Sequence, residues 1–148
     1  LRWIGRRAYD GRFIKGRRDV LPVTIQAGAL GENLPRRDLT ISPLHAMYID
    51  GFLIPAMHLV NGVTINQACC VKNVSYIHLE LESHDVIIAE GAPSESFVND
   101  CSRNMFHNAH EFAELYPDAD NAPAVYCAPR LESGDHLDEI CRRLFNAA

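Results

Sequence analysis

Hydrophobic and polar residues alternate in short runs through the first 99 residues of the chain. These runs are rich in branched and aromatic residues, and Gly, Pro or Asp separates them, which is typical of β-strands. Many short strands with frequent turns predict an all-β domain rather than alternating βαβ units. The runs lie at 20–28 (VLPVTIQAG), 38–42 (DLTIS), 46–56 (AMYIDGFLIPA) and 74–91 (VSYIHLELESHDVIIAEG).

Two of these runs carry more detail. In 46–56, Asp50-Gly51 stands between two apolar arms, which predicts a tight hairpin. In 74–91 we expect two strands around a polar turn at 82–85. The first of them alternates with a period of two, which predicts one face in water. The polar positions are Tyr76, His78, Glu80 and Glu82, and the apolar ones are Ile77, Leu79 and Leu81.

The last third of the chain changes to a helical pattern. Apolar residues recur at helical spacing in 107–116, where Pro117 ends the run, and again in 133–146. We therefore expect residues 1–100 to form the β domain and residues 101–148 to form a helical C-terminal extension packed on its edge. The expected apolar stripes are Ala109, Phe112, Ala113 and Tyr116 in the first helix, and Leu137, Ile140, Cys141, Leu144 and Phe145 in the second.

Composition limits the class of protein. The 148 residues are 47% hydrophobic and 22% charged, which excludes a disordered chain and fits one domain. No apolar stretch approaches the ~20 residues that a membrane-spanning helix needs. The chain begins at Leu1 without a signal-peptide pattern, so we interpret it as a piece of a longer protein. Its localisation, cytoplasmic or secreted, stays open.

The charge is uneven, since half of the 14 Lys and Arg residues lie in the first 18 positions. A nucleic-acid or membrane patch is one interpretation. We favour a solvated hairpin without a nucleic-acid partner, because apolar residues alternate with the charges and no aromatic platform accompanies them. The basic residues are Arg2, Arg6, Arg7, Arg12, Lys15, Arg17 and Arg18, and the apolar ones are Trp3, Ile4, Phe13 and Ile14.

The cysteines give no sign of a metal or cofactor. Their number, five, is odd and none forms a C-x-x-C pair, so we predict reduced and mostly buried thiols. His107 and His110, with Glu111 beside them, could ligate a metal from one helical turn. No third ligand follows at a diagnostic spacing, which favours a solvated helix start. We therefore predict no metal and no cofactor, and expect His58 to be structural.

Two short stretches could carry chemistry. In Ser42-Pro43-Leu44-His45 a turn would bring the hydroxyl and the imidazole together, so that they could hold an amide and protonate a departing amine. The alternative is a histidine buried in the core. In Ser83-His84-Asp85 the histidine and the carboxylate could each reach a different partner, or the stretch could be an ordinary turn.

Three long stretches together resemble the bacterial Hint domain, the module shared by Hedgehog autoprocessing domains and inteins. They are "LRWIGRR", "LPVTIQAGALGENLPRRDLTISPLHAMYIDGFLIPAMHLVNG" and "YIHLELESHDVIIAEGAPSESFVND". The resemblance covers residues 1 to about 100, and the tail with "CAPRLESGDHLDEICRRL" is similar to an extension found in one bacterial branch. It implies an antiparallel β fold of the Hint type.

The resemblance also implies a site and a reaction. Ser42 and His45 stand at the first and last positions of the family's T-x-x-H motif, and His84 and Asp85 fall in its later motif. In the family, an N-terminal Cys or Ser attacks the preceding carbonyl, and the resulting thioester or ester is then cleaved. The implied substrate is the protein's own upstream polypeptide. Asp85 is the candidate carboxylate to raise the pKa of His45.

Two departures from the family pattern qualify this prediction. The nucleophile belongs ahead of "RWIG", so we expect a domain truncated at its N-terminus, with an unpaired strand edge and no activity of its own. Asn99-Asp100-Cys101 only approximates the ending that splicing needs, so we expect the longer protein to cleave rather than splice. The alternative is a degenerate, non-catalytic Hint module of a large bacterial protein. A metal-dependent hydrolase is a third reading, resting on scattered histidines.

Overall fold

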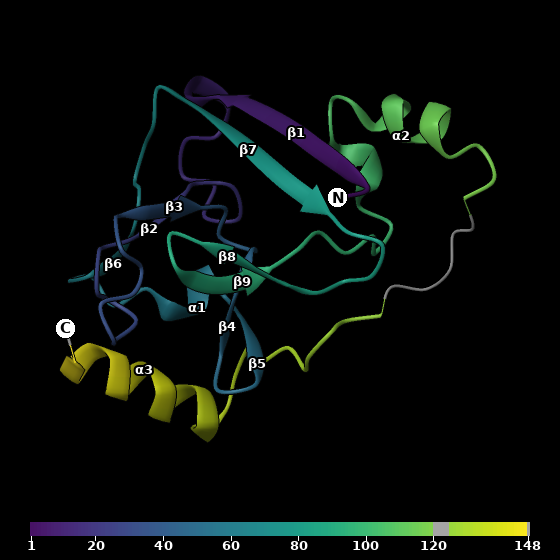
Figure 1. Cartoon of the computed structure of the whole chain (residues 1–148). Coiled ribbons are helices and arrows are strands. Elements are labelled where there is room, and N and C mark those ends of the chain that lie inside the picture. Colours follow the sequence, from purple (N-terminus) through teal and green to yellow (C-terminus); the bar gives the residue numbers. More distant parts are fainter. Residues whose placement is uncertain (120–124, 148) are drawn as a thin grey trace.

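Short strands make up most of the regular structure. The computed structural model describes residues 1–119 and 125–147, and in these ranges it has nine strands, three α-helices and two 3₁₀ helices (Figure 1). The strands are β1 (Trp3–Asp10), β2 (Val23–Ile25), β3 (Leu39–Ile41), β4 (Ala46–Ile49), β5 (Phe52–Pro55), β6 (Ile65–Gln67), β7 (Asn73–Glu80), β8 (Val86–Ala89) and β9 (Ala92–Glu95). The helices are η1 (Gly11–Phe13), α1 (Ala56–Leu59), η2 (Arg103–Met105), α2 (Ala109–Leu115) and α3 (Asp135–Ala147).

The strands form three antiparallel sheets. β1 and β7 pair along their whole length as a two-stranded ribbon. β3, β2 and β6 form a second sheet in that order, and β5, β4, β9 and β8 form a third. In Figure 1 the ribbon lies at the top and α3 at the bottom, with the other two sheets between them. The fold is therefore mainly antiparallel β with C-terminal helices, as the sequence predicts.

The hairpin predicted over 46–56 is confirmed. β4 and β5 pair residue for residue, from 46 opposite 55 to 49 opposite 52. Asp50 and Gly51 connect them with φ angles of 52° and 86°. Positive φ at both turn positions is what a type I′ turn requires, and Asp-Gly is among the dipeptides that adopt it most readily.

β7 faces the opposite way from the prediction. Ile77 is 64% exposed, whereas Glu80 is buried and His78 packs against the Phe106 ring at 5.1 Å between centroids. The Glu80 carboxylate accepts hydrogen bonds from both terminal nitrogens of Arg103. The prediction that this polar face meets water is therefore wrong for His78 and Glu80, which find partners inside the protein, whereas Glu82, beyond the end of β7, is exposed.

Long-range pairing replaces a local hairpin at the N-terminus. β1 pairs with β7, and 11–13 form a 3₁₀ helix, so the hairpin expected at the start of the chain is wrong. The segment 74–91 does form two strands around its turn. That turn, however, joins two sheets, because β7 pairs with β1 and β8 pairs with β9.

Both predicted helices form and pack on hydrophobic clusters. α3 lays Leu137, Ile140 and Leu144 on the main core beneath the two larger sheets, while Phe145 stays half exposed. α2 covers a second cluster through Phe112. The main core consists of Val23, Ile25, Ala29, Met47, Ile54, Ala56, Leu59, Ile65, Ala92, Leu137, Ile140 and Leu144, and the second of Trp3, Phe97, Phe106 and Phe112.

Asn108 covers part of the outer edge of the ribbon. Its side chain accepts a hydrogen bond from the Arg6 N–H at 2.8 Å and donates one to the Ile4 carbonyl, also at 2.8 Å. The His107 N–H adds a bond to the Arg6 carbonyl at 2.9 Å. A buried asparagine thus takes the place of a neighbouring strand along this stretch of β1.

The cysteines are free thiols, but most of them are not buried. Cys69, Cys70, Cys101 and Cys127 are exposed, and Cys141 is half-buried. The prediction of mostly buried thiols is therefore wrong. As for membranes, none of the helices in the described ranges is both long enough and apolar enough to cross a bilayer.

Candidate active site

The Ser42–His45 stretch forms a tight turn immediately before β4. The His45 N–H donates to the Ser42 carbonyl at 3.2 Å, closing the turn around the buried Pro43. The start of α1 secures it, because the Ala56 N–H donates to the His45 carbonyl at 2.9 Å and the Met57 N–H to that of Pro43 at 2.9 Å. The predicted pair is thus held on a fixed piece of backbone.

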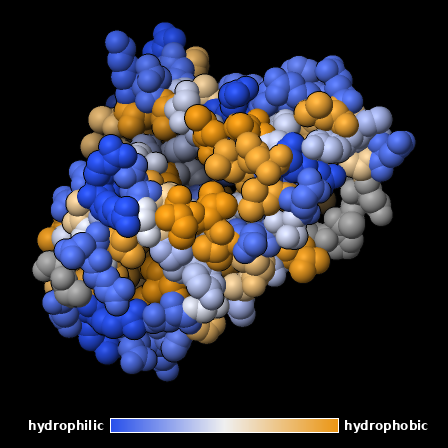
Figure 2. Space-filling model, viewed as in Figure 1, coloured by the Kyte–Doolittle hydropathy of each residue, from blue (hydrophilic) through white to orange (hydrophobic). Residues whose placement is uncertain are grey.

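A cavity of about 480 Å³ lies beside this turn. Ser42 and His45 both line it, together with His78 from β7 and Glu95 from β9. Much of the remaining lining is apolar or aromatic. Figure 2 shows hydrophobic side chains gathered around a hollow in the middle of the face that it draws. The volume falls within the range of ordinary ligand sites.

Burial keeps two imidazoles of this wall neutral. The Nε2 atom of His45 lies 3.4 Å from the Ser94 hydroxyl oxygen, and the rings of His45 and His78 meet edge to face at 5.6 Å. Burial lowers the pKa of His45, and Arg130 and His84 lower it further against the opposing charge of Glu95. Burial, with the neighbouring His45, lowers the pKa of His78 to about 4. Both rings are therefore neutral at pH 7, and each has one ring nitrogen with a free lone pair.

Glu95 is the buried carboxylate of the site, with 6% of its surface exposed. Its Oε1 accepts the Ala46 N–H at 2.7 Å, and its Oε2 accepts a hydrogen bond from Arg130 at 2.9 Å. Burial by itself would raise the pKa of Glu95. His84, His45 and Arg130 outweigh that effect, with help from the Ala46 amide, and lower the pKa. Glu95 is therefore ionised at neutral pH.

His84 stands behind Glu95 rather than in the cavity lining. Its side chain is 2% exposed, and its Nε2 faces the Glu95 Oε2 at 3.5 Å. The Cys127 N–H donates to its Nδ1 at 2.9 Å, so the ring proton of the neutral form resides on Nε2, toward the carboxylate. His84 thus faces the carboxylate whose charge also acts on His45.

Asp85 lies on the surface and outside the cavity lining. Its Oδ1 accepts the N–H of the adjacent Val86 at 2.7 Å. Its backbone N–H donates to the Ser96 hydroxyl at 3.0 Å, and its carbonyl accepts the Ser96 N–H at 2.8 Å. The carboxylate whose charge raises the pKa of His45 is Glu95, and not Asp85 as expected from the sequence.

The histidines considered as metal ligands lie elsewhere. His107 and His110 are exposed near α2, and Glu111 accepts a hydrogen bond from Asn108 at 2.8 Å. Within the described residues, no group of three or more His, Cys, Asp or Glu side chains is arranged to hold a metal ion. His58 lies half-buried in α1, where its carbonyl accepts from the Cys141 thiol at 3.4 Å.

Glu95 and Arg130 are site residues that the sequence analysis missed. The sequence does contain a local signal for Glu95. It is the one charged residue in a short run of small residues, Ala-Pro-Ser-Glu-Ser, none of which could neutralise its charge if the run is buried. Arg130 has none, since it reaches Glu95 from 35 positions away.

The fold and the site define a mainly antiparallel β domain that holds acid–base side chains against a cavity. A family model described as the Hint domain matches residues 1–101. The chain therefore belongs to the Hint domain family. Comparisons with curated proteins and with solved structures gave no match.

Proposed function

We propose that this Hint domain cleaves a peptide bond of its own longer polypeptide by an N-to-S or N-to-O acyl shift. The observation that carries the proposal is the cavity whose lining combines Ser42, His45 and Glu95. The substrate is the upstream polypeptide, which supplies the nucleophile, a Cys or Ser thiol or hydroxyl. The 148-residue chain by itself is inactive in this account.

The shift begins when the nucleophile attacks the carbonyl carbon of the residue before it. Amide resonance, worth a rotation barrier of ~18–20 kcal/mol, protects that bond. His45 rests neutral because burial lowers its pKa, so it accepts the proton of the nucleophile. As the C–N bond breaks, the imidazolium returns this proton to the amine nitrogen. The products are an ester or thioester and a free amine, and water then hydrolyses the ester.

The other residues support this proton transfer. Ser42, at the first position of the turn, holds the amide by a hydrogen bond from its hydroxyl. Glu95 stabilises the imidazolium of His45 by its negative charge, which acts strongly in a buried site. His84 fixes the carboxylate from behind, and Asp85 anchors the loop of His84 to Ser96 through its backbone.

Mass spectrometry of the chain joined to its native upstream residues tests the proposal. We expect self-cleavage, and we expect His45→Ala to slow it by roughly 10²- to 10⁴-fold, the usual contribution of a general acid–base group. His107→Ala is the matched control, since His107 is exposed and distant in sequence from the turn. Equal effects of the two variants would remove the assignment. No cleavage over days, with or without added thiol, would favour the non-catalytic Hint module instead.

A further inference from the structure

A segment beyond the residues that the family model matches reaches the candidate active site. The match ends at residue 101, yet residues 126–130 contact Glu95, His84 and the turn before β4. We propose that this segment completes the site and that Arg130 is a positioning residue, which holds Glu95 and the Ser42–His45 turn in one arrangement. This inference rests on the proposed function.

Backbone pairing fixes the segment on β5. The Leu53 N–H donates to the Pro129 carbonyl at 2.8 Å, and the Leu131 N–H donates to the Leu53 carbonyl at 2.9 Å. Leu53 and Arg130 thereby form a parallel bridge. Since Leu53 is fully buried, the position of Arg130 along the strand is set by the core rather than by its own side chain.

Arg130 joins two parts of the site through one guanidinium group. Its Nη1 donates to the Glu95 Oε2 at 2.9 Å, and its Nη2 donates to the Leu44 carbonyl within the turn at 3.2 Å. The other oxygen of Glu95 holds the Ala46 N–H, next to His45. The planar guanidinium can serve both acceptors at once, which a single ammonium group does less well.

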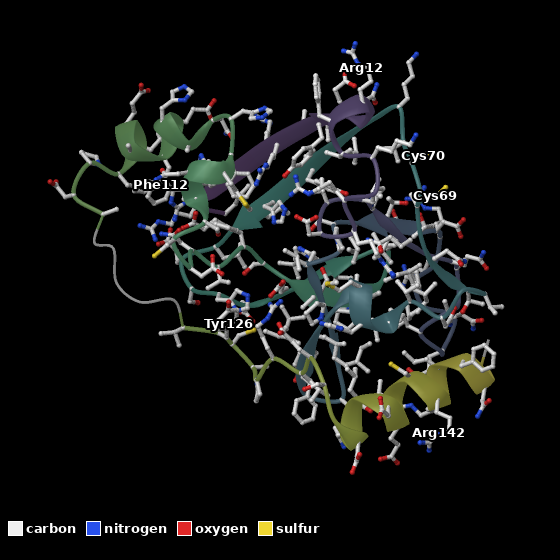
Figure 3. All side chains as sticks on the ribbon, turned by 180° about the vertical axis from the view of Figure 1, so that it is seen from behind. Arg12, Cys69, Cys70, Phe112, Tyr126 and Arg142 are labelled. Carbon is white, nitrogen blue, oxygen red and sulfur yellow. The ribbon has the colours of Figure 1, made fainter. Side chains whose placement is uncertain are left out.

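Two further residues of the segment act on His84. The Cys127 N–H donates to its Nδ1 at 2.9 Å, and the Tyr126 ring packs edge to face on it at 5.5 Å. Tyr126 also lies 5.4 Å from the guanidinium of Arg130, and Figure 3 shows it on the stretch that leads to α3. Of the two side chains that face the Glu95 Oε2, Arg130 thus belongs to this segment and His84 contacts two of its residues.

The electrostatic consequence can be measured at His45. The charged and titratable groups that face it are His78 from β7, Glu95 from β9, His84 from the loop between β7 and β8, and Arg130. The positive charge of Arg130 disfavours a second positive charge on the imidazole. Removing it should therefore raise the pKa of His45.

The test is a pH titration of the histidine ring signals by NMR on the 148-residue chain. Arg130→Met should raise the pKa of His45 relative to the wild type. Arg143→Met is the matched control, because it removes another tail arginine from an ion pair, 2.6 Å from Asp50, that is not part of the cavity lining. Arg130→Lys keeps the charge and should leave the pKa of His45 close to that of the wild type. Arg130→Gln also removes the charge but keeps hydrogen-bond donors, and it should raise the pKa in the same way if Arg130→Met does not fold.

Cleavage of the longer polypeptide supplies the second readout. Arg130→Met should slow it by roughly 10- to 100-fold through misplacement of the turn and Glu95, Arg130→Lys should recover part of the loss, and Arg143→Met should match the wild type. A wild type that does not cleave would refute the proposed function, while the titration would still decide the role of Arg130. A His45 titration unchanged in Arg130→Met would overturn the inference even if cleavage occurs.

Discussion

Replacing His78 by phenylalanine should make the fold less sensitive to acid. The folded protein binds a proton at this ring with a pKa of about 4, because the ring is buried against Phe97, Phe106 and His45. In the unfolded chain the same ring has its ordinary pKa of 6.5. Since the unfolded state binds more protons in this interval, the free energy of unfolding falls as the pH drops from 6.5 to 4.

The size of the effect follows from the shift. A pKa lowered from 6.5 to about 4 corresponds to roughly 3 kcal/mol, at about 1.4 kcal/mol per unit. That is a large fraction of the ~5–15 kcal/mol that stabilises a typical domain. His78 makes no side-chain hydrogen bond among the described residues, so phenylalanine removes the titration without leaving a polar partner unpaired.

Urea unfolding followed by the fluorescence of Trp3, the single tryptophan, measures this directly. Between about pH 7 and pH 4, the wild type should lose roughly 3 kcal/mol more than His78→Phe. His110→Phe makes the same change at an exposed position of α2 and should keep the wild-type dependence. If His78→Phe loses stability with acid as steeply as the wild type, the reasoning from buried imidazole is refuted.

Three further predictions concern the scaffold, each measured by urea unfolding at neutral pH. Asn108→Ala uncovers the edge of β1 and should cost roughly 2 kcal/mol, whereas Asn104→Ala, at an exposed position, should cost almost nothing. Gly51→Ala places a side chain at φ +86° and should cost about 1 kcal/mol; no loss would contradict the turn assignment. Leu144→Ala should cost roughly 2–5 kcal/mol because α3 belongs to the main core, and the same cost at half-exposed Phe145 would argue against that packing.

Local signals predicted the β4–β5 hairpin and α3 correctly. The Asp50-Gly51 hairpin depends on the conformational preferences of two residues, and the α3 stripe on the spacing of its apolar side chains, so both could be read from the sequence. The orientation of β7 could not be read in this way. Its alternation is real, but the polar face points inward because Arg103 neutralises Glu80 from 23 positions away.

In the candidate site, too, contacts between residues close in sequence could be predicted and contacts between distant residues could not. Ser42 and His45 are three positions apart, and a turn alone brings them together. Glu95 contacts the start of β4 from 49 positions away, and Arg130 reaches the Leu44 carbonyl from 86 positions away. Such contacts depend on how the sheets pack, which no local pattern in one sequence encodes. The same limit explains why the sequence points to Asp85, adjacent to His84, and gives no sign that Glu95 reaches the site.

The most direct test of the account is to trap its covalent intermediate. The longer native polypeptide would be incubated with hydroxylamine, which attacks esters and thioesters far faster than amides, and the released upstream fragment would be analysed by mass spectrometry. The account predicts faster cleavage and an upstream fragment that ends in a hydroxamate, because hydroxylamine displaces the nucleophile from the acyl intermediate. His45→Ala should slow formation of the hydroxamate product by the same roughly 10²- to 10⁴-fold as cleavage. An upstream fragment that ends only in a carboxylate, at a rate unchanged by hydroxylamine, would contradict the acyl shift.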